Sequence, residues 1–290
     1  TFYPGDMIIV GFDTHIGNGW DMITITSFVD IGPGTTFILG NLVYEYEDAA
    51  NVSTGRWYRC SSDGGKSQSG HPQYLEITYN GTVALSAGTV LCITLNSVDD
   101  CLEEIKVNGV ISSDFTDNSS GQVNMSSNDP DAIFLMQGTF SPIQTSGSAY
   151  NYRTFSGSVL GGIQSRGQFQ SFTVPGNNGG ERVSRIHPDL ECLALNTGVA
   201  TGEFYQYYYE FAIHIGSQHE LLTNIFDMAG TWAIGAGTTS NEVPTCGINF
   251  TVTNSSVNGQ WTGESNEDWF NCANWDSYAV PDSTTDVTIN

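Results

Sequence analysis

Residues 5–40, GDMIIVGFDTHIGNGWDMITITSFVDIGPGTTFILG, decide the fold. The run from Met7 to Phe12 is apolar on both faces, which predicts a central, buried strand. A second run of β-branched and aromatic residues follows between Ile23 and Val29. Ile31-Gly-Pro-Gly34 then predicts a tight reversal, because Pro fixes φ and Gly adopts positive φ, before a third strand over 35–39. The stretch therefore predicts three buried strands on which the rest of the chain builds.

The composition of the whole chain agrees with a β protein. Of its 290 residues, 39% are hydrophobic and 13% are charged, which is typical of a globular protein with a sizeable core. Abundant Gly, Thr, Ser, Asn and Tyr favour pleated strands and turns. We expect an all-β fold: a β-sandwich-like main domain over 1–240 with one short helix, and the start of a second, Trp-rich β module over 241–290.

The charge balance is strongly acidic. Eight Lys and Arg stand against 31 Asp and Glu, a formal net charge of -23, which repels nucleic acid and anionic membrane surfaces. The acid excess serves either solubility or binding of a divalent cation such as Ca²⁺, which prefers oxygen ligands. The best calcium candidate is the turn with Asn128, Asp129 and Asp131, near Asp114 and Asp117, although an ordinary Asp-Pro turn explains it equally.

The cysteines favour an oxidising compartment. There are six, an even number with no CxxC pair, which favours disulfides over a metal site. Cys92 and Cys101 flank a short polar loop and are paired first. Cys246 with Cys272 and Cys60 with Cys192 follow, although other connectivities stay open. No apolar run is long enough to span a membrane, and a start at Thr1 fits a mature, exported protein.

The most aromatic part of the chain reads as a strand, and a helix follows it. On an alternating strand Tyr205, Tyr207 and Tyr209 share a face. That face either stacks on sugar rings or packs inside the protein, and packing inside is the commoner arrangement. Ser217 and Glu220 form a capping box, and the apolar spacing after them predicts the one clear helix.

Nothing in the sequence indicates catalysis. The five histidines lack metal-ligand spacing, and no GxSxG motif occurs. Adjacent acidic residues, such as Glu103 and Glu104, point to opposite faces of a strand and cannot act on one bond. We therefore expect a non-enzymatic protein.

Two sets of segments resemble a known family. The sequences GDMIIVGF, FVDIGPGTT, AIFLMQG and ELL…GTW resemble the N-terminal module of large secreted surface proteins of Bacteroidota, in the segments that begin at Gly5, Phe28, Ala132 and Glu220. WTG, DWF, ANW, VP and DVTI resemble a repeat that introduces further β modules in those proteins, in the segments that begin at Trp261, Asp268, Ala273, Val280 and Asp286. The resemblance implies export, commonly by type IX secretion, and a surface, adhesin or fibre role. It supplies no catalytic residues.

These observations favour an extracellular structural or adhesive protein. We expect association through β edges. The terminal strand, formed by Asp286, Val287, Thr288 and Ile289, is expected to lack a partner within the chain. The expected acceptor edge is the opening sheet of 5–40. Its partners are then copies of itself or other surface proteins. The alternative is a carbohydrate-binding module that uses Tyr205, Tyr207 and Tyr209 or the edges of Trp269 and Trp275.

Overall fold

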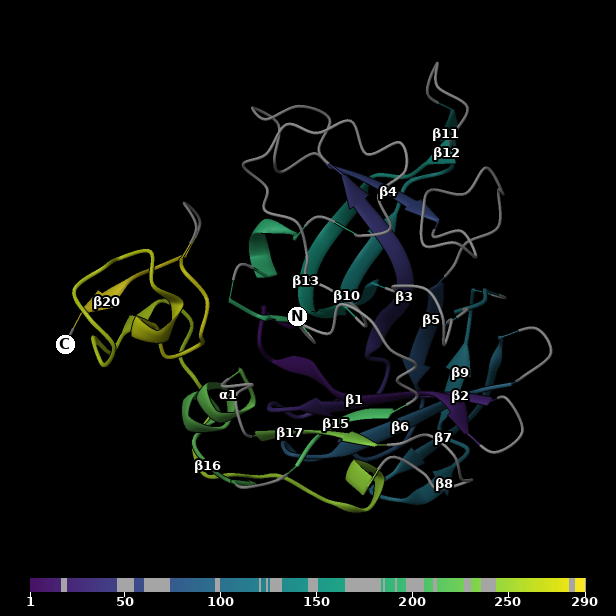
Figure 1. Ribbon diagram of the computed structural model, residues 1–290, viewed down its shortest axis with the longest axis horizontal. Coiled ribbons are helices and arrows are strands. Elements are labelled where there is room, and N and C mark those ends of the chain that lie inside the picture. The colour runs from purple at the N-terminus through teal and green to yellow at the C-terminus, as the bar shows by residue number, and fades with distance from the viewer. Residues whose placement is uncertain are drawn as a thin grey trace.

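The computed structural model is a two-layered β protein that confirms the all-β expectation (Figure 1). It describes residues 1–16, 20–45, 55–59, 74–96, 100–119, 121–123, 125, 132–145, 151–164, 184, 186–190, 192–196, 206–210, 213–226, 231–235, 244–281 and 285–289. No helix in these ranges is long and apolar enough to cross a membrane.

The first sheet has seven strands in antiparallel pairs. Their order across the sheet is β17 (Trp232–Gly235), β15 (Gln206–Tyr209), β1 (Met7–Ile16), β2 (Trp20–Ser27), β6 (Val90–Leu95), β7 (Leu102–Val107) and β8 (Val110–Ser112). The predicted Asn108-Gly109 hairpin joins β7 to β8, and both turn residues have the positive φ that this tight turn requires, 50° and 81°.

The second sheet lies against the first. Its order is β14 (Ala194–Asn196), β13 (Phe155–Gln164), β10 (Ala132–Phe140), β3 (Thr36–Glu45), β5 (Tyr74–Tyr79) and β9 (Phe115–Asp117), with β4 (Arg56–Arg59) also paired to β3. A short hairpin of β11 (Gln144–Thr145) and β12 (Asn151–Tyr152) stands at one end.

The opening stretch forms the three predicted strands but divides them between the layers. β1 and β2 are neighbours in the first sheet, whereas β3 is central in the second. The reversal at Gly34 carries the chain across: its φ is 81°, and its N–H donates to the Tyr79 carbonyl at 2.7 Å. Because β1, β2 and β3 each have a partner on both sides, the expectation that this stretch offers an acceptor edge is wrong.

The core between the sheets is built from alternate residues of these central strands. Met7 and Ile9 of β1 face it from the first sheet, and Phe37 and Leu39 of β3 face it from the second. All four are at most 1% exposed. Burial of side chains of this size contributes about 1.5 to 3 kcal/mol each, so this layer stabilises the fold.

The outer face of β1 is buried as well, which explains its apolar alternation. Ile8 and Val10 belong to a cluster with Leu221 and Leu222 of the helix α1 (Gln218–Phe226). The capping box is confirmed, because the Ser217 N–H donates to Glu220 Oε2 at 2.8 Å and the Glu220 N–H donates to Ser217 Oγ at 3.2 Å. The 3₁₀ turns η2 (Pro188–Leu190) and η3 (Pro244–Gly247) also pack on the sandwich.

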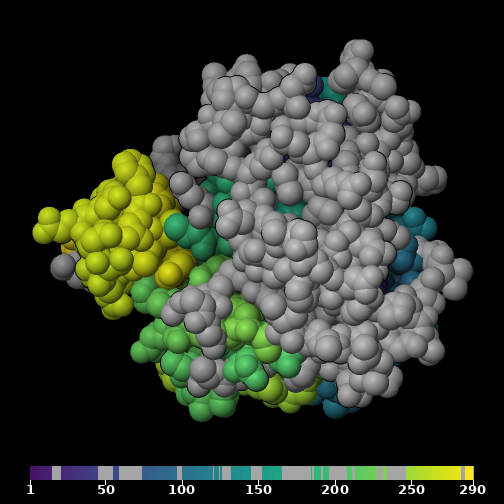
Figure 2. Space-filling view, viewed as in Figure 1, coloured from purple at the N-terminus to yellow at the C-terminus, as the bar shows by residue number. Residues whose placement is uncertain are grey.

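The last part of the chain first lines the sandwich and then leaves it. β18 (Thr251–Val252) pairs with β16 (Ile215–Gly216) beside α1. Residues 256–281 and 285–289, here named the C-terminal lobe, then project from the body as a small yellow mass (Figure 2). The lobe contains η4 (Cys272–Asn274) and a two-stranded parallel pair, β19 (Gln260–Trp261) with β20 (Thr288–Ile289).

Candidate functional site

The C-terminal lobe is fastened to the sandwich by a disulfide and a buried amide. Cys192 and Cys272 form a disulfide with their Cα atoms 6.0 Å apart. Gln218, fully buried, donates from Nε2 to the Gly5 carbonyl at 3.2 Å and accepts the Ser256 N–H on Oε1 at 3.0 Å. The lobe therefore has a defined position against the start of β1 and the helix α1.

Three tryptophans and one asparagine pack together in the lobe, with Trp275 and Asn274 fully buried among them. The Trp269 and Trp275 rings meet edge to face with centroids 4.6 Å apart, and Trp275 Nε1 donates to the Trp269 carbonyl at 2.9 Å. Trp261 stacks on Trp269 at 5.9 Å. The buried Asn274 makes four side-chain hydrogen bonds, to the backbone of Ser265, Asn266 and Asp268 and the side chain of Asn266. This network replaces the larger apolar core that so small a unit lacks.

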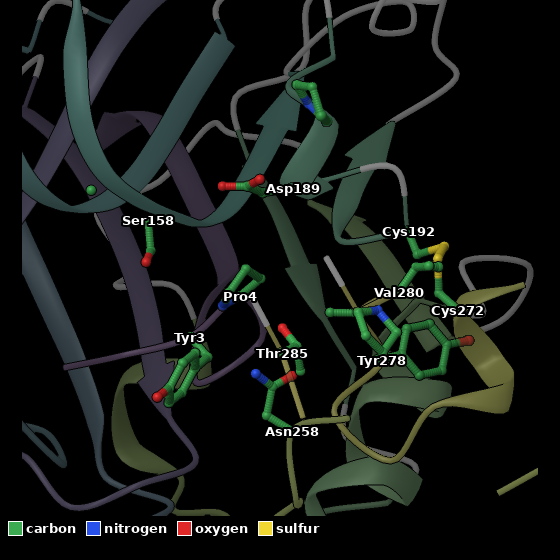
Figure 3. A pocket seen from close by; sticks show the side chains of 14 residues that line it. Tyr3, Pro4, Ser158, Asp189, Cys192, Asn258, Cys272, Tyr278, Val280 and Thr285 are labelled. Carbon is green, nitrogen blue, oxygen red and sulfur yellow. A yellow bond between two sulfur atoms is a disulfide. The ribbon is translucent and has the colours of Figure 1, made fainter. Parts of the chain in front are cut away.

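A cleft opens where the lobe meets the sandwich (Figure 3). Its volume is about 510 Å³, within the range of small-molecule sites. Its walls come from the chain start, β13, η2 and the lobe: Tyr3, Pro4, Gly157, Ser158, Pro188, Asp189, Cys192, Asn258, Cys272, Tyr278, Ala279, Val280, Pro281 and Thr285. The Cys192–Cys272 disulfide closes one side.

A second cavity adjoins the first. Its volume is about 500 Å³, and its lining includes Asp6 and Asp30. Tyr3 and Asn258 line both cavities, so the two lie next to each other. Both lie along the junction of lobe and sandwich and are together named the groove.

The polar groups of the groove are held in place. Asp189 Oδ2 accepts the Val159 N–H at 3.3 Å, which anchors the carboxylate over the edge of β13. Asn258 Oδ1 accepts from the Ser277 hydroxyl at 3.3 Å. In the second cavity Asp6 accepts the Tyr3 N–H at 2.8 Å, and burial raises the pKa of the Asp6 carboxyl above its usual value.

Two tyrosines supply aromatic surface. Tyr3 is 49% exposed and lines both cavities. Tyr278 has a φ of 59°, a conformation costly for a residue with a side chain, and its ring stacks on Phe226 of α1 at 6.0 Å. Strained backbone of this kind concentrates at functional sites, so the position of Tyr278 in the cleft wall favours the cleft as a candidate site.

A neutral histidine, His187, lies next to Asp189 of the cleft wall. The His187 ring lies 5.6 Å from the Trp57 ring, nearly parallel to it, and 4.7 Å from the Tyr44 ring. Its Nδ1 accepts the Asp189 N–H at 3.2 Å, so the ring proton belongs on Nε2. Although Asp189 Oδ2 lies 3.6 Å from Nδ1, burial lowers the pKa of His187 to about 3, and the two groups form no ion pair near neutral pH.

His187 is expected to make the protein less stable in acid. An unfolded histidine takes up its proton near pH 6.5, whereas the folded one stays neutral until about 3, so the unfolded state binds more protons between these values. Stability should therefore fall by about 3 kcal/mol from pH 7 to pH 4 through this group alone. His187→Asn, which retains an acceptor, should flatten that fall in urea titrations at both pH values.

The exposed His214 provides the control for this test. His214→Asn makes the same chemical change at an exposed position, and the pH dependence of the His187→Asn variant is compared with it. An equal loss of stability in acid for the His187→Asn variant would contradict the assignment of the neutral histidine.

The predicted disulfide pairs are wrong. Cys92 bonds to Cys246, with Cα atoms 5.6 Å apart, and Cys192 bonds to Cys272. These bonds exclude the expected Cys92–Cys101, Cys246–Cys272 and Cys60–Cys192 pairs. Cys92 faces Lys106 across the β6–β7 ladder, whereas Cys101 precedes β7 near its turn. Cys101 therefore lies several residues along the strands from Cys92, and each residue adds about 3.3 Å, so the two sulfur atoms are too far apart to bond.

Among the expected sugar-stacking residues whose side chains the structure describes, two are buried and one is exposed. Tyr209 is fully buried, and its hydroxyl donates to the Ile213 carbonyl at 2.9 Å, so it cannot present a ring face. The Tyr207 side chain and Tyr205 lie outside the described residues. Trp275 is fully buried too, whereas Trp269 is 38% exposed.

The expected terminal strand has a partner. Gln260 pairs with Thr288 and Trp261 with Ile289, and the Thr288 N–H donates to the Gly259 carbonyl at 2.9 Å. The prediction that Asp286, Val287, Thr288 and Ile289 form an unpaired strand is therefore wrong for its last two residues. Asp286 and Val287 precede β20 and are exposed.

The calcium candidate Asn128, Asp129 and Asp131 lies outside the described residues. Nearby, Asp117 Oδ1 accepts the Ser119 N–H at 3.0 Å and the Glu76 N–H at 3.1 Å, which orders a turn. Within the ranges that the structure describes, no group of three His, Cys, Asp or Glu could hold a metal ion.

Sequence reasoning missed Tyr3, Asp189, Asn258 and Tyr278. They come from four separate segments, and no motif or spacing links them. Comparisons with known proteins add no relative to guide the choice: no protein-family model, curated protein or solved structure matches this chain.

Proposed function

We propose that this chain is part of an extracellular structural or adhesive protein, of the kind that its resemblance to Bacteroidota surface modules implies, and that it assembles through the C-terminal lobe. Two disulfides between distant parts of the chain fit an oxidising environment and support an extracellular location. One of them, Cys192–Cys272, joins the lobe to the sandwich, and the other, Cys92–Cys246, joins β6 to η3 within the body.

The observation that carries this proposal is the apolar surface of the lobe. Five large apolar side chains of the lobe are exposed, with Phe270 at 75% and Ile289 at 65%. The others are Val257, Val287 and Trp269. Because all five belong to so small a unit, we take this part of the chain as the interaction surface.

The β19–β20 pair supports assembly by strand addition. Each strand has only two residues, and Thr288 and Ile289 of β20 are exposed. A two-stranded sheet is barely stable alone, so a further strand would complete it with backbone hydrogen bonds. The proposed partner strand is therefore added to the lobe, not to the opening sheet.

Charge favours a head-to-tail arrangement of copies. All eight Lys and Arg lie between Arg56 and Arg185, and residues 244–289 contain only acidic charges. Two lobes would repel each other more strongly than a lobe and residues 56–185 of another copy, because that segment holds all eight Lys and Arg beside its eleven Asp and Glu. Such a heterologous contact does not close on itself and generates a filament.

The proposal predicts that Phe270→Ser with Ile289→Ser abolishes assembly. Burial of these two side chains contributes about 3 to 5 kcal/mol, so the double change should weaken self-association by at least about a hundredfold. Sedimentation velocity and negative-stain electron microscopy measure the effect.

The matched control lies on the far edge of the first sheet. Val110 and Ile111 of β8 are 70% and 66% exposed, so Val110→Ser with Ile111→Ser removes comparable apolar surface away from the lobe. These changes should leave assembly intact. A strictly monomeric unsubstituted protein, or equal assembly by the lobe variant, would overturn the proposal.

A further inference from the structure

We infer that the groove, the two neighbouring cavities that share Tyr3 and Asn258 in their linings, binds a neutral oligosaccharide. The site differs from the assembly surface, because Phe270 and Ile289 are not among its lining residues. It also differs from the tyrosine strand, in which Tyr209 is buried.

The size and shape of the groove fit a chain of sugar rings. Two cavities of about 510 and 500 Å³ both have Tyr3 and Asn258 in their linings, so a ligand long enough to occupy both would contact these two side chains. A single small metabolite would fill only one of them.

The lining chemistry fits hydroxyl groups. Ser158 and Thr285 supply hydroxyls, Asn258 supplies an amide, and Asp189 supplies a carboxylate on a different wall of the cleft (Figure 3). A sugar hydroxyl both donates and accepts, so it can use each of these groups. The half-exposed Tyr3 ring offers an apolar face to the C–H side of a sugar ring, and its phenol adds a hydrogen bond.

The charge of the groove excludes anionic ligands. Asp189 lines the first cavity and Asp6 and Asp30 line the second, while no Lys or Arg lines the described parts of either. With a net charge of -23 on the whole chain, phosphorylated or acidic sugars would be repelled. A peptide strand is disfavoured because turns, η2 and the disulfide make up most of the wall, with the edge of β13 occupied at Val159 by the Asp189 carboxylate.

The groove is rigid before any ligand arrives. The Cys192–Cys272 disulfide and the buried Gln218 amide hold its two sides together, and the strained Tyr278 forms part of one wall. A preformed site loses little conformational entropy on binding, which compensates for the modest strength of each sugar contact.

The test uses the whole chain with a panel of neutral hexasaccharides: β-linked and α-linked glucans, mannan, xylan and chitin fragments. Saturation-transfer NMR identifies the bound sugar, and calorimetry measures its affinity. Tyr3→Ala, at an exposed position, should weaken binding about tenfold, because one aromatic contact contributes about 1.4 kcal/mol. Asn258→Ala should weaken binding by a similar factor.

Phe270→Ala provides the matched control, since it removes an exposed aromatic ring of the lobe outside the groove. It should bind the same sugar with unchanged affinity, even where it impairs assembly, so failure of one proposal does not entail failure of the other. Unchanged binding by both groove variants would overturn the location. Absence of binding to every hexasaccharide at millimolar concentration, or preference for acidic sugars or peptides, would overturn the ligand class.

Discussion

Replacing Cys92 and Cys246 together with alanine is expected to lower the free energy of unfolding by about 5 kcal/mol, which corresponds to a fall of about 10 °C in Tm for a chain of this size. The bond joins residues 154 positions apart, and a cross-link across so long a loop restricts the unfolded chain strongly. Both cysteines are buried, where β6 packs against η3 on the outer face of the first sheet.

Calorimetry of the double variant measures this loss, and non-reducing peptide mapping verifies the bond itself. Cys101→Ala serves as the control, because the Cys92–Cys246 peptide should persist in it unchanged. A peptide that links Cys92 to Cys101, or a double variant that melts within about 2 °C of the unsubstituted protein, would contradict the assigned connectivity.

Asn274→Ala is expected to unfold the C-terminal lobe while the sandwich stays folded. The change removes four hydrogen bonds of 2.8 to 2.9 Å and leaves the N–H groups of Ser265 and Asn266 without their acceptor. The free energy of unfolding of the lobe should fall by about 4 kcal/mol. In a unit with so small a core, the packing of the three tryptophans alone does not compensate for that loss.

Hydrogen exchange measured by mass spectrometry distinguishes the two parts. Amides of residues 259–276 should lose protection in the Asn274→Ala variant, whereas those of β1 and β3 should keep it. Asn254→Ala, at an exposed position just before the lobe, is the control and should leave both regions protected. Full protection of the lobe in Asn274→Ala would show that the tryptophans suffice.

Local patterns predicted the elements well. Three features are each determined by residues that are close in sequence: the apolar run at β1, the capping box at Ser217 and the Asn108-Gly109 turn. The burial of β1 on both faces also follows from its composition, because a strand without a polar side must be covered twice.

The candidate site was not predictable in the same way. Tyr3 and Asn258 are 255 positions apart and meet only because the lobe folds back to the chain start, where Gln218 joins Gly5 to Ser256. The disulfide prediction was wrong for the same reason. Cys92 bonds to a cysteine 154 positions away, whereas sequence reasoning favoured a cysteine nine positions away.

Residue order alone thus settled what is local: an all-β chain, acidic, with buried central strands, one capped helix and a tryptophan-rich end. Only the tertiary structure decided that residues 5–40 divide between two sheets, which cysteines join, that β20 pairs with β19, and that a groove lies beneath the lobe. The reason is physical. Strand and turn propensities depend on neighbouring residues, whereas cavities, cross-links and sheet edges depend on contacts between segments whose separation in sequence carries no information about their distance in space.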